Sequence, residues 1–497
     1  METLFVEEDI LIRILLPLDV ISLKSIESSS LAFWNFTKRT KLWRRKFHED
    51  NPNFFDNSAL SEDILLREKS VLGFDDHFKF KRLSLKYHSL LKNWKTKNFI
   101  KKAYKISSKI DAEEKLMSIN SKFLLTTTRS EFFNSLRTIY DLNNFSVVKT
   151  FETEPKYQVL SADFTKSYVV MFGEQQLVGD PAGLNHHDYN FCVKVFREPR
   201  YEVVCQSVLL HDPEFTVESR VQLCGEKVVL FVSQCRARDL NTGDHQDSLH
   251  IFTFSEPGLK FMKHERKITL RLPRQKYLSI FHFDSQNVIG SRKKNTLVEV
   301  WSLETCDLVD DCWTAPVMWS SDVGYGNVIK CSSVYYRDPL AYIGKSNGRC
   351  DLWDCRLDLR LRSLLHYSGP QTERHLLVTR ILLTTNHLLS LTSEGKLFVW
   401  DRQEVEEVGL GHLDLNQTDP LWTSASLVRG HKIVSVFSDE TKLVTLVSGP
   451  RQADTSILMY DFWHHRNNGN YGVKLNRKTS FSDNSGPKKR RSKNSNM

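Results

Sequence analysis

The chain has 497 residues, of which 40% are hydrophobic, and a formal net charge of +9. This length accommodates up to about three average domains, and the apolar fraction is ordinary for a globular protein with a substantial core. The sequence contains no apolar run long enough to cross a membrane, and its first ten residues are acidic where a secretory signal would be basic. We therefore expect neither a membrane protein nor a secreted one.

The positive charge is concentrated in two segments. Residues 79–105 contain ten Lys or Arg and no Asp or Glu, and residues 477–497 contain seven Lys or Arg and one Asp. The rest of the chain is therefore net acidic. This distribution does not indicate a uniformly nucleic-acid-binding surface.

Residues 4–48 predict a small helical unit. Apolar residues recur at helical spacing from Ile10 to Leu18, where Pro17 interrupts the pattern. A second apolar face runs from Val20 to Phe36, and the segment from Leu42 to Phe47 closes the unit. A unit of this size buries too little surface to be stable alone, so we expect it to pack on the following domain or on a partner.

A helical connector follows, with helices predicted over residues 60–72 and 78–94. Aromatic residues alternate there with the ten cations, a composition that also occurs where proteins stack on single-stranded nucleic acid. We favour the alternative in which the aromatic rings pack inward while the Lys stems lie along the surface. Nucleic acid is therefore not an expected partner.

The segment Gly395–Asp401 has the alternating pattern of a β-strand and ends in Trp-Asp. Close or looser copies recur at residues 137–141, 192–196, 249–253, 297–301, 350–354 and 457–461. Their spacing of roughly fifty residues is expected of radially repeated four-stranded blades. We therefore predict an all-β, seven-bladed propeller over residues 99–466. The strand-like segment Phe99–Ile106 precedes the first repeat, and we expect it to complete the last blade and so close the ring.

Three N-terminal segments, Glu7–Leu15, Leu18–Leu23 and Leu42–Arg45, resemble an F-box. The segment Lys92–Lys95 resembles the Asn-Trp signature with which F-box/WD-repeat proteins enter their propeller. The last repeat retains most of a WD-repeat set, namely Gly430, His431, Asp439, Ser448, Tyr460 and Asp461. The chain thus resembles the F-box/WD-repeat family, which divides it into an F-box (1–50), a helical linker (51–98), a propeller (99–466) and a disordered basic tail (467–497).

The resemblance implies a non-catalytic substrate receptor of a Skp–cullin–F-box ubiquitin ligase. In that family a three-helix motif docks on the Skp adaptor, which joins it to the cullin scaffold, and the propeller binds the target protein. The adaptor-binding residues it implies are Ile10, Leu11, Ile14, Leu15, Leu18, Leu23, Leu42 and Trp43. The alternative is a WD-repeat scaffold that assembles partner proteins without a ligase.

Two connections between the second and third strands of a blade are predicted to be long, Gly173–Asn190 and Cys235–Ser248. Loops on a rigid scaffold often carry function, although tolerated surface variation also explains them. Cations at the same rim of blades three and four are expected to form a site for an acidic or phosphorylated target; they are Arg236, Arg238, Arg292, Lys293 and Lys294.

The basic tail suggests the compartment. Four consecutive cations, Lys488, Lys489, Arg490 and Arg491, lie among Ser, Asn and Gly residues and predict a nuclear import signal, with a solvated charge run as the alternative. Nine cysteines, none in a Cys-x-x-Cys pair, suit a reduced protein. We expect the nucleus, the cytoplasm or both.

Motifs for catalysis are not convincing. Gly344–Ser346 resembles the end of a phosphate-binding loop, but Pro339 occupies the position of the first required Gly. The histidines of His186–Asp188 and His464–His465 have no partners at zinc-like spacing. We therefore expect no enzyme activity, no cofactor and no metal.

Overall fold

The computed structural model describes the backbone of the following residues: 2–51, 76–105, 113–119, 123–129, 135–141, 146–152, 157–164, 168–176, 189–197, 202–209, 215–224, 227–236, 245–254, 263–270, 279–283, 286–292, 297–303, 305, 307–309, 312–315, 317–322, 331–366, 377–407, 419–424, 431–448 and 455–463. The connector helix predicted over residues 60–72, the import signal and the two histidine motifs lie outside these residues.

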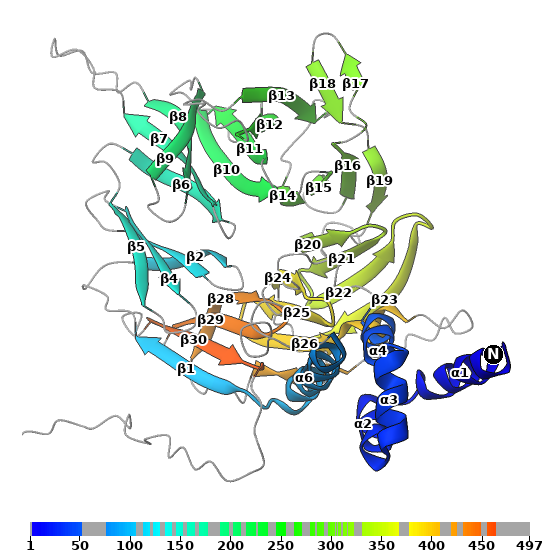
Figure 1. Ribbon diagram of the computed structural model, residues 1–497. Helices are drawn as coiled ribbons and strands as arrows, with labels where there is room; N and C mark the ends of the chain where they lie inside the picture. The colour runs from blue at the N-terminus through cyan, green and yellow to red at the C-terminus, as the bar shows by residue number, and fades with distance from the viewer. Residues whose placement is uncertain are drawn as a thin grey trace, which may run out of the picture.

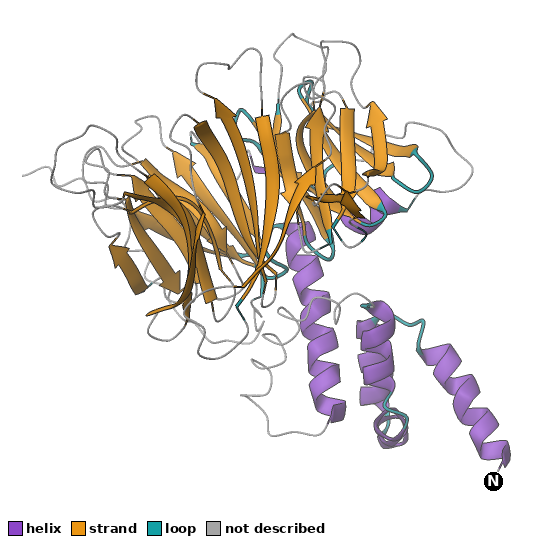
Figure 2. Ribbon diagram, turned by 90° about the horizontal axis from the view of Figure 1, so that it is seen from above, coloured by secondary structure: helices purple, strands orange, loops and turns teal. Residues whose placement is uncertain are grey.

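Short helices precede the sheets and lie together on one side of the molecule (Figure 2). They are α1 (Glu2–Leu15), α2 (Val20–Ser29), α3 (Leu31–Arg39), α4 (Leu42–Asp50) and α6 (Asp76–Thr96). The resemblance implied three helices before residue 50, but the structure has four. The second apolar face is split at Ser30, whose backbone is extended and whose side chain accepts a hydrogen bond from the amide of Ala32, so that it caps α3.

The predicted seven-bladed propeller is confirmed, because the remaining strands form seven sheets arranged in a ring (Figure 1). Blades one to three use β2 (Glu113–Ile119), β3 (Phe123–Arg129), β4 (Ser135–Asp141), β5 (Val147–Glu152); β6 (Tyr157–Phe164), β7 (Tyr168–Gln176), β8 (Tyr189–Arg197), β9 (Glu202–Leu209); and β10 (Phe215–Cys224), β11 (Lys227–Arg236), β12 (His245–Thr253), β13 (Lys263–Leu270). Blades four to six use β14 (Ser279–Phe283), β15 (Asn287–Arg292), β16 (Leu297–Ser302), β19 (Val317–Asp322); β20 (Cys331–Arg337), β21 (Leu340–Lys345), β22 (Arg349–Asp354), β23 (Leu359–Leu365); and β24 (Val378–Leu383), β25 (His387–Thr392), β26 (Leu397–Asp401), β27 (Trp422–Thr423). A short helix, α7 (Arg402–Glu406), follows β26.

Blade seven is built from both ends of the propeller sequence. Strands β28 (Lys432–Ser438), β29 (Lys442–Ser448) and β30 (Thr455–Asp461) are completed by β1 (Ile100–Lys105), which pairs antiparallel with β30. The prediction that the segment after the connector closes the ring is therefore confirmed. Closure in this way leaves the last blade without a free edge on β30.

A shift in register recurs in more blades than the Trp-Asp pair, which is complete only at Trp353-Asp354 and Trp400-Asp401. In blades one, two, four, five, six and seven, the first strand shifts by one residue against the second, as between Val378 and Arg380 in blade six. Such bulges increase the local twist of a strand. The divergent repeats thus share a backbone feature that their side chains do not reveal.

A hairpin extends blade three beyond four strands. Strands β17 (Asp307–Val309) and β18 (Cys312–Ala315) come from blade four, and β18 pairs in parallel with β13. The outer edge of blade three is therefore covered by its neighbour in the ring.

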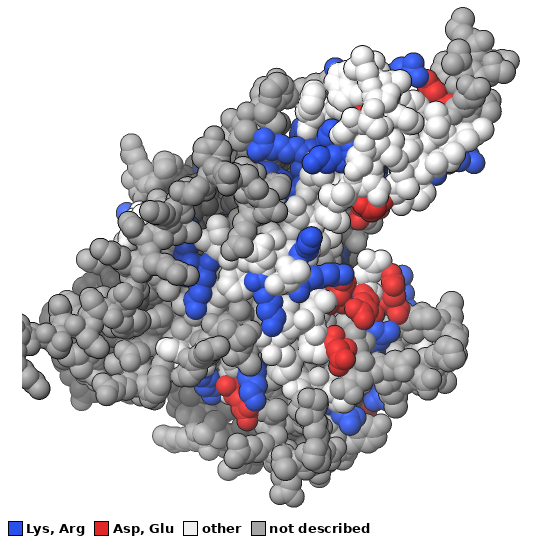
Figure 3. Space-filling view, turned by 90° about the horizontal axis from the view of Figure 1, so that it is seen from below, with Lys and Arg blue, Asp and Glu red and all other residues white. Residues whose placement is uncertain are grey.

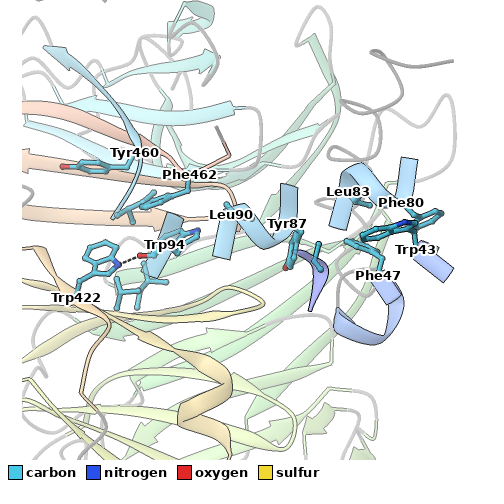
Figure 4. Packing of buried hydrophobic residues seen from close by; sticks show 14 of the residues in the cluster. Trp43, Phe47, Phe80, Leu83, Tyr87, Leu90, Trp94, Trp422, Tyr460 and Phe462 are labelled. Atoms are coloured by element: carbon cyan, nitrogen blue, oxygen red, sulfur yellow. Dashed lines mark hydrogen bonds between the residues drawn. The ribbon is translucent and has the colours of Figure 1, made fainter. Parts of the chain in front are cut away.

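The helices and the propeller share one apolar core. A single cluster of buried side chains runs from Ile12 and Trp43 through Tyr87 and Trp94 to Phe462 (Figure 4). The expectation that the N-terminal unit packs on the domain that follows it is confirmed.

Candidate protein-interaction surfaces

The C-terminal end of α6 is fixed to the propeller by a fully buried tryptophan. The ring of Trp94 stacks on Phe462, with centroids 3.9 Å apart, and on His387, with centroids 4.6 Å apart. Its indole Nε1 donates to the backbone oxygen of Glu440 at 2.9 Å. The indole of Trp422 in turn donates to the backbone oxygen of Trp94 at 2.8 Å (Figure 4). The indole therefore holds α6 by stacking and by hydrogen bonding together.

Polar side chains at the same junction are also paired. The side-chain amide of Asn93 donates to the backbone oxygen of Phe462 at 2.9 Å. The amide of Asn386 donates to the hydroxyl of Tyr87 at 2.6 Å and to the carboxylate of Glu440 at 3.3 Å. Asn93 and its neighbour Trp94 thus lie at the entry to the propeller, where the Asn-Trp signature predicts them.

Burial shifts the ionisation of two groups at this junction. It raises the pKa of the Glu440 carboxyl, against the hydrogen bonds from Thr385 and Asn386. It also lowers the pKa of His387 to about 4, so the ring beside Trp94 is neutral at neutral pH. A junction held by buried aromatic contacts is little affected by salt.

The helices occupy one defined rim of the propeller. Glu440 lies in the turn between β28 and β29, and Asn386 lies in the turn between β24 and β25. Both turns join the first and second strands of a blade. The connections between second and third strands lie at the opposite end of the blades, so the opposite rim is not covered by α6.

A buried carboxylate joins four helices of the N-terminal unit. Glu27 of α2 accepts hydrogen bonds from the hydroxyl of Thr37 at 2.7 Å and from the indole of Trp43 at 3.1 Å. The imidazole of His77 lies 2.9 Å from the same carboxylate, which is also paired with Lys81. Burial alone raises the pKa of Glu27, but the hydrogen bonds outweigh it and hold the pKa at about 2.

The structure divides the predicted adaptor-binding residues into two groups. Leu15, Leu23, Leu42 and Trp43 are buried inside this chain, and Leu18 is half-buried against the same core. These side chains pack within the helical core and are not exposed on its surface. Of the eight predicted residues, only Ile10, Leu11 and Ile14 are exposed.

Other exposed apolar side chains lie on the next two helices. Ile10 and Ile14 of α1 are 51% and 58% exposed, Ile21 of α2 is 50% exposed and Leu31 of α3 is 73% exposed. Single exposed apolar residues are common, but several on three short helices are characteristic of an interaction surface.

The predicted basic rim is described only in part. Arg236 ends β11 and Arg292 ends β15, so their backbones lie at the same end of neighbouring blades. Their side chains, and all of Arg238, Lys293 and Lys294, lie outside the described residues. The two connections are shorter than predicted because the strands extend further: β7 runs to Gln176, and β12 begins at His245. Figure 3 shows one face of the molecule, on which Lys and Arg are interspersed with uncharged and acidic residues.

Sequence reasoning missed a polar set in blade six. The ring nitrogens of His366 lie 2.7 Å from the backbone oxygen of Gly348 and within hydrogen-bonding distance of the Ser390 hydroxyl. The imidazole also contacts Trp400 edge-on, with centroids 5.0 Å apart, and its burial lowers its pKa to about 4. No Gly precedes His366, so the Gly-His signal that marks His431 is absent here.

In blade seven, Asp439 of the WD-repeat set shapes the turn between the first two strands. The Asp439 side chain accepts hydrogen bonds from the backbone amides of Thr441 and Lys442, each at 2.7 Å, and so forms the turn between β28 and β29. Tyr460 packs edge-on against Phe99 at 4.9 Å.

The segment that resembles a phosphate-binding loop has a structural role. Lys345 is buried and forms an ion pair of 2.5 Å with the buried carboxylate of Asp351. Gly344 lies so close to Val378 that a β-carbon would come within 2.8 Å of that side chain. The lysine is thus engaged within blade five.

Two further observations concern the described residues. None of the described helices is both long and apolar enough to span a lipid bilayer. Within the described ranges, His, Cys, Asp and Glu side chains form no group of three that suits a metal ion.

No known protein family matches this sequence, and no curated protein matches it. Solved structures with partial similarity include the crystal structure of the computationally designed Ika8 protein, which is 12% identical and covers 72% of this chain and 98% of its own, with a TM-score of 0.42. Another is the crystal structure of BamB from Moraxella catarrhalis, which is 10% identical and covers 73% of this chain and 99% of its own, with a TM-score of 0.40. Both TM-scores are low, and the propeller is established by its own sheet topology.

Proposed function

We propose that this chain is the substrate-receptor subunit of a Skp–cullin–F-box ubiquitin ligase. The observation that carries the proposal is the set of exposed aliphatic side chains on the N-terminal helices, Ile10, Ile14, Ile21 and Leu31. These helices satisfy their own core, since Trp43 is fully buried, yet they leave large aliphatic side chains in solvent. Burial of such residues by a partner is favourable, and here the partner is the adaptor.

The arrangement suits a receptor that positions a target and performs no chemistry itself. The stacked and hydrogen-bonded junction at Trp94 holds the helices to one rim of the propeller. We assign the target protein to the opposite rim, where Arg236 and Arg292 end their strands. An acidic or phosphorylated segment of the target would pair there with these arginines. A rigid connection between the two ends raises the effective concentration of target lysines near the ubiquitin-carrying enzyme.

The test is recovery of the adaptor and cullin with the full-length chain. Changing Ile10→Asp together with Ile14→Asp places charges on the exposed surface without entering the core. We expect adaptor affinity to fall by about thirtyfold or more, since loss of an interface anchor costs about 2 kcal/mol or more. The matched control is Met318→Asp with Leu357→Asp, which alters equally exposed apolar residues of the propeller.

Three outcomes separate the alternatives. Loss of adaptor and cullin only in the helix variant supports the receptor. Undiminished recovery in that variant contradicts the assigned surface. If the wild-type chain recovers other proteins but neither adaptor nor cullin, the chain is a propeller scaffold without a ligase role.

A further inference from the structure

A groove separates α1 from the turn between α3 and α4. Its volume is about 690 Å³, and its walls are formed by Glu8 and Asp9 on one side and by residues of α4 on the other. The exposed apolar residues Ile10, Leu11 and Ile14 do not line this groove.

The α4 wall of the groove is a basic stripe. Lys41, Arg44, Arg45 and His48 line the groove, and their spacing of three, four and seven residues places them on one side of the helix. The opposite side of α4 is fully buried and carries Trp43, among other core residues. Helix α4 is thus amphipathic, with cations on its exposed side and core residues on its buried side.

These cations have little compensation within the chain. Arg39, at the end of the groove, is paired with Glu8 of α1. Arg44 lies 3.9 Å from Asp76, but both side chains are at least half exposed, so this pair contributes little. Within the residues that the structure describes, neither Lys41 nor Arg45 has an acidic partner within ion-pair distance.

The lining therefore carries an excess of positive charge in a concave site. It contains four Lys or Arg and two acidic residues when His48 is neutral. Like charges gathered in a cleft concentrate anions from solution. A groove of this volume is larger than a single inorganic anion requires and accommodates several residues of a peptide.

We propose that this groove binds an acidic peptide segment of a partner protein, whose carboxylates pair with Lys41, Arg44 and Arg45. Guanidinium groups bind carboxylates through charge-assisted and often bidentate hydrogen bonds. The proposal does not require the partner to be a ligase subunit, and it uses a different set of residues from the apolar surface of α1.

Nucleic acid fits the same groove less well. Glu8 and Asp9 on the facing wall repel phosphates and carboxylates alike, so the discrimination rests on the groove's lack of large aromatic rings: the described lining contains no Phe, Tyr or Trp. Binding of single strands also relies on free aromatic faces. Phe80, which lies beside two of these side chains, is buried and already contacted by Arg44, 5.7 Å from its centroid, and by His48, 5.9 Å away.

The experiment measures binding of a fluorescein-labelled octaglutamate peptide to the full-length chain by fluorescence anisotropy at low salt. The groove variant is Lys41→Glu with Arg45→Glu. The control, Arg13→Glu with Lys24→Glu, makes the same change of net charge at exposed cations of α1 and α2 that do not line the groove. We expect affinity to fall at least about tenfold in the groove variant and less than about twofold in the control.

Equal weakening in both variants would show general electrostatic attraction and would overturn the proposal. A labelled octauridylate is measured in parallel, and tighter binding of that probe with the same dependence on Lys41 and Arg45 would also overturn it.

Lys41 has a left-handed backbone, with φ of 53°. If the double glutamate variant does not fold, Lys41→Asn with Arg45→Gln removes both charges with a residue that tolerates that conformation. Unchanged octaglutamate binding in this variant likewise refutes the site.

Discussion

Replacement of Trp94 by alanine tests whether α6 is held to the propeller as the structure indicates. The indole is fully buried, stacks on Phe462 at 3.9 Å and donates a hydrogen bond to Glu440 at 2.9 Å. Removing a buried Trp side chain costs about 3–5 kcal/mol, of which about 1 kcal/mol is the hydrogen bond. We expect Trp94→Ala to lower the free energy of unfolding by this amount. The urea midpoint, followed by far-UV circular dichroism, should fall by at least about 1 M.

The matched control is Trp463→Ala, next to the same junction. Trp463 is only partly buried, and its ring contacts the ammonium group of Lys86 at 5.7 Å. It should cost much less than Trp94→Ala. Trp94→Phe, which keeps a stacking ring but loses the donor to Glu440, should fall between the two. If Trp94→Ala and Trp463→Ala shift the midpoint equally, the indole is not what fixes α6.

Two other predictions concern the buried carboxylate of α2 and the tail. The hydrogen-bonded Glu27 has a pKa of about 2, below its ordinary 4.5, so its stabilising contribution is complete above pH 4.5 and is lost as the pH falls towards 2. Glu27→Gln should cost about 1.5–3 kcal/mol at pH 7 and flatten the dependence of the thermal midpoint on pH between 2 and 5; a dependence identical to that of the wild type would contradict this account. Changing Lys488, Lys489, Arg490 and Arg491 to Ala should shift a fluorescently tagged chain from nucleus to cytoplasm, whereas unchanged localisation would leave these cations as a solvated charge run.

The propeller could be predicted because its signal is repeated. Segments such as Leu397–Asp401 alternate apolar and polar positions and recur at a regular interval, and each is a third strand of its blade. The closing strand was predictable because a strand pattern that precedes the first repeat has no blade of its own. Ile100–Lys105 is such a segment, and it pairs with β30. Repetition compensates for the weakness of each single pattern.

Features that depend on contacts between blades left no comparable signal. The pairing of β18 with β13 joins Trp313 to Ile268, and nothing local in either strand indicates its partner. The contact of His366 with Ser390 likewise depends on the bend that brings the end of β23 to β25. Helical spacing alone could not show that Leu15 is buried and Ile14 exposed, because the packing of α1 against neighbouring helices sets the width of its buried face.

In the segment Leu42–Arg45, which resembles part of an F-box, some residues belong to the core of the chain and others are exposed. Leu42 and Trp43 are fully buried, and the indole of Trp43 donates to Glu27 inside the helical unit. Arg44 and Arg45, the next two residues, line the basic groove. A substitution at Trp43 would leave the Glu27 carboxylate short of a donor and open a cavity, so a loss of partner binding in that variant would report lost folding. Substitutions at Arg45 or Ile14 leave the core intact. Exposed positions such as these, unlike Trp43, can distinguish binding of a partner from stability of the helices.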